Sequence, residues 1–485
     1  MAESLKRKTG LAIFWSFVDK GGQQLLQLVF IFILTRLIDK SDFGLVAVLG
    51  IFTAIAGILQ ESGFSSALIR KKHVLPQEYT SVFYFNILIS ISIYSILFLC
   101  APIIGSYFEK PILEDISRVL FLSFVFNAFG IIQNVHLIKS MNFKLNTRIT
   151  LLAGIIASVI SIILAFLGFG VWSYVVQIVL LSALRTIFLW IFVKWRPQDK
   201  FSFAHIRDMS SFSIKLLLTS LLNQACDKIF PLLIGKNFDM SHVASFDQGK
   251  RLTNIPQSII GDGIKAVAYP LLSNLDHNVE SRGKKVFRKV IRISAFISFP
   301  VAILIIVLAK PAIAFYFPKE WADVIPLLQI LAIGGAFLPL YYQISSLLQY
   351  KGKSALLLKL EILRNVILLL SIFVTIKYGV PGLATGISIV NALSFFIGIF
   401  FAGRTILYSF KEVVMDVVPY MIIAIVAILP FILLQRLGVD NIYILFFIPL
   451  IGGSCLYLLI LKILGSVIIQ DTIDFVKQSL KKIYA

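Results

Sequence analysis

Polar and charged side chains interrupt an apolar segment close to the start of this 485-residue chain. The segment 15–30 reads WSFVDKGGQQLLQLVF and contains Lys20, Gln23 and Gln24. A helix turns by about 100° per residue, so these three side chains share one face, and Asp19 lies beside Gln23 on its flank. The remaining faces are apolar. The segment therefore predicts a helix with a single polar stripe.

Two later segments carry similar stripes. One has amide and charged side chains at Asn223, Gln224, Asp227 and Lys228. The other has polar side chains at steps of three or four, at Asp247, Lys250, Arg251, Asn254, Ser258, Asp262 and Lys265. A charge at the centre of a membrane helix costs about 2.5–3.5 kcal/mol, so such side chains usually face a bundle interior or a water-filled space. The three segments are predicted to line a wet space.

The chemistry that these stripes favour is the binding of an anion. In the third segment the basic Lys250, Arg251 and Lys265 outnumber the acidic Asp247 and Asp262. A surplus of cations in a low-dielectric space requires an anion. Arginine binds phosphate oxygens through its bidentate fork, and lysine acts as a compact point charge.

Internal ion pairing is one alternative explanation of these charges. Asp19 would then neutralise Lys20, Asp227 would neutralise Lys228, and Asp247 would neutralise Lys250 or Arg251. Adjacent residues point about 100° apart on a helix, so neither of the first two pairs is well placed locally. A cation can also be a topology charge at the cytoplasmic end of a helix, and the sequence leaves both alternatives open.

The elements that position these stripes belong to a membrane protein. Hydrophobic residues make up 58% of the chain, charged residues make up 14%, and the mean hydropathy is +0.90. These values exclude a soluble domain and predict an all-α integral membrane protein. The three cysteines and five histidines are dispersed, so no disulfide framework, metal site, cofactor or catalytic constellation is expected.

Fourteen apolar segments are long enough to cross a bilayer, which needs about 20 apolar residues. They lie at 11–37, 43–64, 79–102, 115–137, 147–167, 170–193, 212–236, 242–270, 287–309, 323–349, 355–377, 381–403, 413–435 and 440–464. The segments 11–37 and 242–270 are the least hydrophobic. The first is too long and too polar for a signal peptide, so we expect it to be retained as a helix.

Lysine and arginine residues gather at alternate connections, for example at residues 70–72 and 194–207. Cytoplasmic loops carry this excess in membrane proteins. Both termini are therefore expected in the cytoplasm. The same rule accounts for much of the formal net charge of +20, so nucleic acid is not an expected partner.

An offset of 200 residues indicates a parallel internal repeat. It lays residues 21–44 over 221–244, so that Gln24 falls on Gln224. Chance similarity between two hydrophobic helices is the alternative. Transporters are often built from duplicated bundles with the binding site at their interface. We therefore expect a six-helix bundle at 1–200, a second at 201–410, and two additional helices with a cytoplasmic tail at 411–485.

Several stretches resemble a known family. They include LTRLIDKSDFGLVAV (34–48), ESGFSSALIRKK (61–72), LGFGVWSYVVQ (167–177), LIGKNFDMSHVASFDQGKRLTNIPQSI (233–259) and FPKEWADVIPLLQIL (317–331). Over roughly residues 8–410 the chain is similar to the bacterial polysaccharide (oligosaccharide) flippases of the multidrug/oligosaccharidyl-lipid/polysaccharide exporter superfamily, especially the colanic-acid-exporter-like branch. The resemblance implies two pseudo-symmetric bundles around a central cavity that opens alternately to cytoplasm and periplasm.

The resemblance also implies a substrate. It is a polyprenyl-diphosphate-linked oligosaccharide repeat unit, moved across the bacterial inner membrane for the assembly of lipopolysaccharide, exopolysaccharide or capsule. The lipid tail can remain in the bilayer. Such a protein makes and breaks no covalent bond, so enzymatic activity is not expected. A polysaccharide polymerase is an implied partner, and a coupling ion (H⁺ or Na⁺) an implied driving force.

Within that resemblance the polar residues take three roles. The expected diphosphate or sugar-phosphate contacts are Lys20, Lys228, Lys250 and Arg251. The expected sugar contacts are Gln23, Gln24, Asn223, Gln224 and Asn254. The candidate ion-coupling carboxylates are Asp19, Asp227 and Glu61.

Two other functions compete with this interpretation. An ion-coupled multidrug exporter of the same superfamily that exports cationic compounds needs an acidic cavity, which the basic segment 247–265 does not favour. A membrane enzyme, such as a polymerase or a lipid-linked glycosyltransferase, needs a catalytic constellation near the surface, often on a long external loop. The connections of this chain are short.

Overall fold

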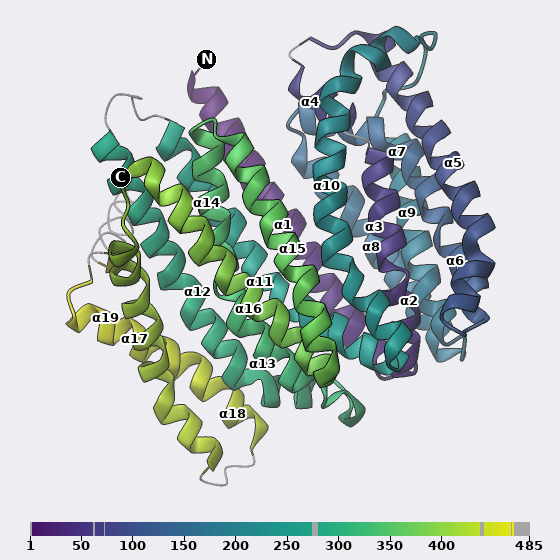
Figure 1. The fold of residues 1–485 in the computed structure, drawn as a ribbon. Helices are drawn as coiled ribbons and strands as arrows, with labels where there is room; N and C mark the ends of the chain where they lie inside the picture. Colours follow the sequence, from purple (N-terminus) through teal and green to yellow (C-terminus); the bar gives the residue numbers. More distant parts are fainter. Residues whose placement is uncertain are drawn as a thin grey trace. The chain divides into compact units, whose positions relative to one another are not determined.

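Helices form the described secondary structure in the computed structural model (Figure 1). The structure describes residues 2–61, 64–71, 73–273, 280–436, 441–466 and 468–469, and none of these ranges contains a strand. The all-α fold class predicted from the composition is confirmed. Contacts between residues group the chain into two compact units, Met1–Ala244 and Ser245–Ala485.

The first unit is built from α1 to α10 and also holds the start of α11 (Met240–Ser273). The bounds of its helices are α1 (Ala2–Leu34), α2 (Lys40–Val48), α3 (Gly50–Glu61), α4 (Phe64–Arg70), α5 (Pro76–Tyr107), α6 (Ile112–Leu120), α7 (Leu122–Lys139), α8 (Phe143–Phe166), α9 (Val171–Phe192) and α10 (Phe203–Asn237).

Small residues allow close helix packing in the first unit. α8 packs against α1 and α9, and α10 packs against α3, α4 and α5. A Cβ added at Gly22 of α1 would lie 3.0 Å from the Leu151 side chain of α8. A Cβ added at Gly235 of α10 would lie 2.8 Å from the Val48 side chain. α10 is therefore a packed component of the first unit, although it begins after residue 200.

The second unit contains most of α11 and all later helices. Their bounds are α12 (Glu280–Tyr316), α13 (Val324–Gly335), α14 (Leu338–Tyr350), α15 (Ser354–Thr375), α16 (Gly379–Gly403), α17 (Phe410–Arg436), α18 (Ile442–Ile448) and α19 (Ser454–Ile463).

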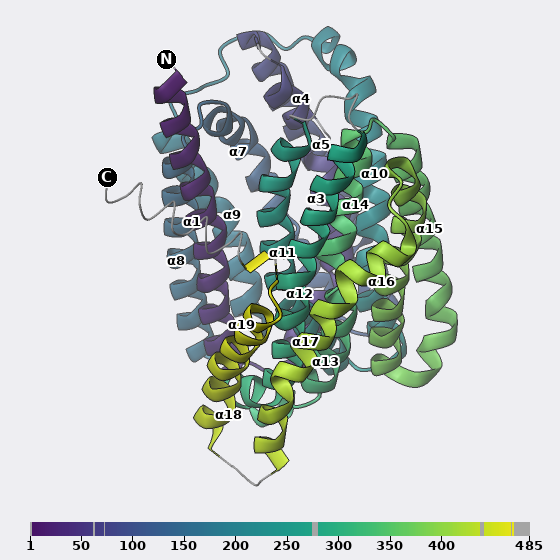
Figure 2. The same cartoon turned by 90° about the vertical axis from the view of Figure 1, so that its left-hand side faces the viewer.

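The long helix α12 organises the packing of the second unit. It packs against α13, α14, α17 and α18. Its residues Phe287 and Phe299 belong to a buried core that includes Tyr341 of α14 and Phe395 of α16. Figure 2 shows α17 beside α12, with α19 next to α17. The helices that follow residue 410 are thus part of this unit's core.

Two features of the first unit have counterparts later in the chain. α2 begins at Lys40 and α11 at Met240, which matches the predicted offset of 200 residues. The turn before α8 has a positive φ of 54° at Met141, and the turn before α15 has one of 67° at Gly352. A left-handed backbone is strained for Met but not for Gly. The division at 1–200, 201–410 and 411–485 concerns sequence repeats and stays a prediction.

Ten candidate membrane spans lie in the described part of the chain, which makes it a multi-pass membrane protein. One of them, Ala355–Ile406, contains both α15 and α16. The long helices α1, α10 and α11 are not among the ten candidate spans, which were identified among the described residues alone. Each of the fourteen segments predicted to span the membrane overlaps one or more of the observed helices. The count of fourteen spans is not confirmed.

Candidate functional site

The apolar face of α1 is fixed by its contact with α8. Gly22 lies against Leu151, and a Cβ added at Gly154 of α8 would lie 3.3 Å from the Leu26 side chain. Thr147 of α8 also donates a hydrogen bond to the carbonyl oxygen of Trp15, at 3.1 Å. These contacts determine which side of α1 is left for its polar residues.

Two polar residues of α1 lie away from that contact. Counting about 100° per residue, Lys20 and Gln24 point to the side opposite Gly22. Lys20 and Gln23 are exposed, and Gln24 is half-buried. Gln23 Nε2 donates a hydrogen bond to Asp19 Oδ1 at 3.0 Å. Asp19 therefore has a neutral partner one turn away, and the two residues form a local polar pair.

The polar residues of α10 lie where this helix packs on α3. A Cβ added at Gly50, the first residue of α3, would lie 4.0 Å from Lys228 Nζ. Lys228 and Asp227 are half-buried, and Gln224 is exposed. The side chain of Asn223 lies outside the described residues. Lys228 therefore lies between two helices of the first unit, within reach of the N-terminus of α3.

One face of α11 is buried within the second unit. Gly249, Thr253 and Gln257 follow at steps of four and are buried. A Cβ added at Gly249 would lie 3.4 Å from the Leu327 side chain of α13. One added at Gly335 would lie 1.6 Å from Gln257 Nε2, so the Gln257 side chain would have to move to admit a larger residue there.

The opposite face of α11 carries the predicted anion contacts. Counting about 100° per residue, Asp247, Arg251 and Asn254 lie on the side away from Gly249, and Lys250 lies at the edge of that face. Asn254 is exposed, and the other three are half-buried. The stripe predicted from the sequence spacing thus lies opposite the packed face. The three charges are two cations and one carboxylate.

The structure thus brings Asp19 together with Gln23 on α1, and it presents Lys250, Arg251 and Asn254 on one side of α11. Glu61 is the last residue of α3, but its side chain lies outside the described residues. The assignment of these residues to diphosphate, sugar or ion stays a prediction.

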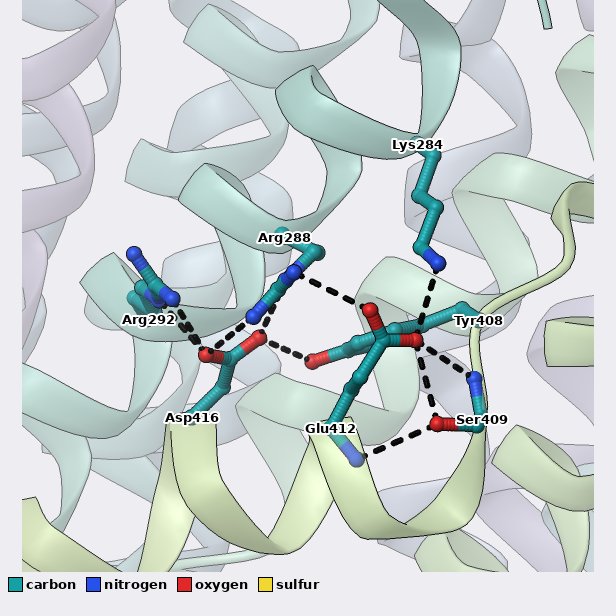
Figure 3. Close-up of polar contacts among 7 residues, drawn as sticks. All are labelled: Lys284, Arg288, Arg292, Tyr408, Ser409, Glu412 and Asp416. Carbon is teal, nitrogen blue, oxygen red and sulfur yellow. Dashed lines mark hydrogen bonds and ion pairs between the residues drawn. The ribbon is translucent and has the colours of Figure 1, made fainter. Parts of the chain in front are cut away.

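The sequence spacing did not reveal a second polar cluster, which joins α12 to α17 (Figure 3). Asp416, whose side chain is 1% exposed, accepts hydrogen bonds from Arg288 Nε at 2.7 Å and from Arg288 Nη2 at 3.0 Å. Arg292 Nε donates to the same carboxylate at 2.7 Å, and the Tyr408 hydroxyl donates at 2.8 Å. Burial, together with this bond to Asp416, raises the pKa of Tyr408 well above its usual range, so the hydroxyl remains protonated.

Glu412 extends this cluster at the start of α17. It pairs with Lys284 Nζ at 2.9 Å and with Arg288 Nη1 at 3.1 Å. It also accepts from the backbone N–H of Ser409 at 2.9 Å, while Ser409 Oγ accepts from the backbone N–H of Glu412 at 3.3 Å. This is a capping box, and the Ser-x-x-Glu spacing is a sequence signal for it. The hydrogen-bond donors around Asp416 and Glu412 indicate that these two carboxylates have a structural role.

A smaller ion pair agrees with a prediction from spacing. Glu361 lies one turn before Arg364 on α15, which predicts a local pair, and Arg364 Nη1 lies 3.5 Å from Glu361 Oε2. Tyr341 also donates a hydrogen bond to Glu361 at 3.1 Å. Among the described residues no group of three or more His, Cys, Asp or Glu side chains is arranged to hold a metal ion.

The described helices include apolar ones of spanning length and three long ones that carry polar stripes, α1, α10 and α11. This combination is typical of a polytopic membrane protein that transports a substrate. The chain belongs to a family described as "Polysaccharide biosynthesis protein", whose sequence model matches residues 33–326. The predicted resemblance to the polysaccharide flippases is confirmed.

Known proteins agree with this membership. The chain is 24% identical over 337 residues to "Succinoglycan biosynthesis transport protein ExoT" of Rhizobium meliloti (strain 1021), covering 70% of this chain and 67% of that protein. Its fold is similar to that of "Lipid II flippase MurJ, inward closed conformation", with a TM-score of 0.75, 18% identity, and coverage of 96% and 99% of the two chains. An inward-facing multidrug resistance MATE family transporter gives a TM-score of 0.63 at 21% identity, over 79% of this chain and 94% of that one.

Proposed function

We propose that this protein is a flippase that moves polyprenyl-diphosphate-linked oligosaccharide repeat units across the bacterial inner membrane. Transport occurs by alternating access and supplies the assembly of a surface polysaccharide. The observation that carries the proposal is the polar face of α11, where Arg251 and Asn254 lie away from the packed stripe of Gly249, Thr253 and Gln257, and Lys250 lies at the edge of that face. The family membership of the chain supports it.

The chemistry of this face suits a diphosphate. Two adjacent cations, one of them an arginine, provide a bidentate fork and a point charge for phosphate oxygens. A charge-assisted hydrogen bond contributes about 1.5–3 kcal/mol, enough to hold an anionic headgroup away from bulk water. In the same proposal Lys20 and Lys228 are further phosphate contacts.

The amide side chains on the same helices suit a sugar. Amides both donate and accept hydrogen bonds, as sugar hydroxyls do. Gln24, Gln224 and Asn254 are the best placed of the predicted set, since the Gln23 amide already donates to Asp19. Asn223 completes the predicted set.

A coupling ion is a separate part of the proposal. Asp19 and Asp227 are half-buried carboxylates on α1 and α10, and Glu61 ends α3. These positions suit a carboxylate that exchanges H⁺ or Na⁺ during transport. Both termini lie in the cytoplasm in this proposal, and a polysaccharide polymerase uses the delivered repeat units.

The double variant Lys250→Gln/Arg251→Gln tests the proposal. It removes both charges and keeps polar side chains, which are shorter than those they replace. We expect surface polysaccharide to fall by at least about tenfold, because each tenfold corresponds to about 1.4 kcal/mol of lost binding. Lipid-linked repeat units should accumulate on the cytoplasmic side, which extraction of the lipids and impermeant labelling of the sugars would measure.

The matched control is Lys351→Gln/Lys353→Gln, which removes two positive charges from the turn between α14 and α15. It should export normally. Membrane insertion of both double variants is checked by immunoblotting of the membrane fraction. Normal export by the inserted Lys250→Gln/Arg251→Gln protein would contradict the role of these two cations.

The alternative is an ion-coupled multidrug exporter, which the likeness to a MATE family transporter favours at the level of the fold. The two half-buried cations Lys250 and Arg251 of α11 weigh against cationic drugs as cargo. Under this alternative, deletion of the gene would raise drug susceptibility and leave surface polysaccharide unchanged. Our proposal expects the opposite pair of results.

A further inference from the structure

A cavity of about 550 Å³ lies within the first unit, between α5 and α10. Its size falls in the range of ordinary ligand pockets, about 300–1,000 Å³. Residues of α3 and α4 close one side of it. Its lining includes Phe85, Leu88 and Ile96 of α5 and Phe203, Arg207 and Leu217 of α10.

The cavity is a groove between α5 and α10, and its lining is almost entirely hydrocarbon. Its polar side chains are Ser92, Ser210 and Arg207. Leu88 and Ile96 of α5 are 62% and 60% exposed, so the groove opens to the outside of the unit along α5. In a membrane-spanning unit such a surface contacts lipid.

The shape of the groove follows its two helices. The lining residues run from Phe85 to Ile96 on α5 and from Phe203 to Leu217 on α10. At about 1.5 Å per residue, these stretches are roughly 16 Å and 21 Å long. The groove is therefore long and narrow, as a single hydrocarbon chain requires.

The charged end of the groove is where both helices begin. The backbone N–H of Ser202, just before α10, donates to Ser81 Oγ near the start of α5, at 3.0 Å. His205 Nε2 lies 3.4 Å from Gln77 Oε1 in the same region. Arg207 follows His205 on α10 and is exposed. Arg207 thus lies one turn after Phe203, near the end of the groove where both helices begin, and most lining residues lie farther along the two helices.

Arg207 has no ion pair with a carboxylate that the structure describes. Lys194 and Lys200 precede it in the same basic segment. Basic segments beside a membrane attract anionic lipid headgroups, by about 1 kcal/mol for each lysine or arginine. An arginine fork at the end of a hydrocarbon-lined groove is complementary to a lipid phosphate.

We infer that this groove binds an acyl chain of an anionic phospholipid from the surrounding bilayer, with the lipid phosphate on Arg207. The lining explains why the occupant is a phospholipid and not the transported repeat unit. Two serines and one arginine suit a single phosphate, whereas an oligosaccharide diphosphate requires several amide or charged groups. The bound chain fills the space between α5 and α10, so it stabilises the packing of α10 in the first unit.

Photocrosslinking tests this inference. The purified full-length protein is reconstituted in vesicles of phosphatidylcholine that contain a small fraction of phosphatidylglycerol with a diazirine on its acyl chain. Peptide mass spectrometry should place the crosslinks on residues 85–96 and 203–217. Arg207→Gln should reduce this labelling by about fivefold. The matched control Lys200→Gln loses the same charge in the same segment but does not line the groove, and it should keep the labelling.

Three outcomes would overturn the inference. Labelling could be spread evenly over other lipid-exposed helices, or it could be equally strong with diazirine-labelled phosphatidylcholine. It could also be displaced by undecaprenyl diphosphate at concentrations where unlabelled phosphatidylglycerol has no effect, which would make the groove a site for the substrate tail. Labelling outside the groove should be unchanged in Arg207→Gln, which shows that this variant is folded.

Discussion

At the scale of single residues, Asp416 shows how a charge can be accommodated inside a helix bundle without being available for chemistry. Its two oxygens receive hydrogen bonds from Arg288, Arg292 and Tyr408, all within 3.0 Å. Removing one partner from a buried ion pair leaves the remaining charges uncompensated, which costs more than the pair itself contributes. By contrast, Arg251 is half-buried and lies on the side of α11 away from the packed stripe of Gly249, Thr253 and Gln257. The environment of each charge, more than its presence, distinguishes a structural role from a binding role.

Asp416→Asn tests the structural role. It keeps the shape of the side chain and removes its charge. We expect the free energy of unfolding to fall by about 3 kcal/mol, the low end for a broken buried pair, because both arginines are partly exposed. Denaturant unfolding of the purified protein, followed by tryptophan fluorescence, measures it. Glu109→Gln is the control, since its pair with Lys236 is exposed and should contribute less than about 0.5 kcal/mol. Equal stability of Asp416→Asn and the unaltered protein would show that the cluster does not anchor α17.

At the scale of helices, small residues determine where two helices touch. A Cβ added at Gly334 of α13 would lie 2.2 Å from the Cα of Ser388 on α16. The Ser388 hydroxyl donates a hydrogen bond to the carbonyl oxygen of Ile330, at 2.7 Å. The two backbones are therefore in direct contact, and neither can move away without losing this hydrogen bond. Close approach of this kind is typical of membrane helices, which gain little from burying apolar surface against lipid.

Gly334→Ala should separate these helices. Because the added methyl group meets backbone, and not a flexible side chain, we expect the protein to lose about 1–3 kcal/mol of stability. The matched control is Gly57→Ala on α3, where an added Cβ meets nothing within 4 Å. That change should stabilise the helix by about 0.5–1 kcal/mol. The same unfolding experiment compares the two, and a Gly334→Ala protein that is as stable as Gly57→Ala would contradict the close contact.

The helices themselves could be predicted from sequence, because hydropathy and side-chain spacing are local properties. The stripe on α11 and the Glu361–Arg364 pair were found in this way. The two arginine partners of Asp416 were not, since they lie 124 and 128 positions away and only the fold brings them together. The break between α6 and α7 at Phe121 was also missed, because no proline or glycine marks it.

At the scale of the whole molecule, the open question is how many helices cross the membrane. α10 and α11 have 35 and 34 residues, long enough to span, but they are not among the ten candidate spans. The proposed transport requires both to cross, because their polar faces must be reachable from an aqueous space inside the membrane. If they instead lay at the surface, the polar stripes would need no binding partner.

Labelling of single introduced cysteines tests whether α10 and α11 cross the membrane. After replacement of Cys100, Cys226 and Cys455 by alanine, cysteine is introduced at exposed positions before α10, between α10 and α11, and near the start of α12: Lys200→Cys, Asn237→Cys and Lys285→Cys. If both helices cross, a membrane-impermeant maleimide added to spheroplasts labels only Asn237→Cys, and the other two react only after permeabilisation, as the distribution of basic residues predicts. Phe169→Cys, in a turn predicted to be periplasmic, is the positive control. Reaction of all three positions from the same side would show that α10 and α11 do not span, and the fourteen-span topology would then be wrong.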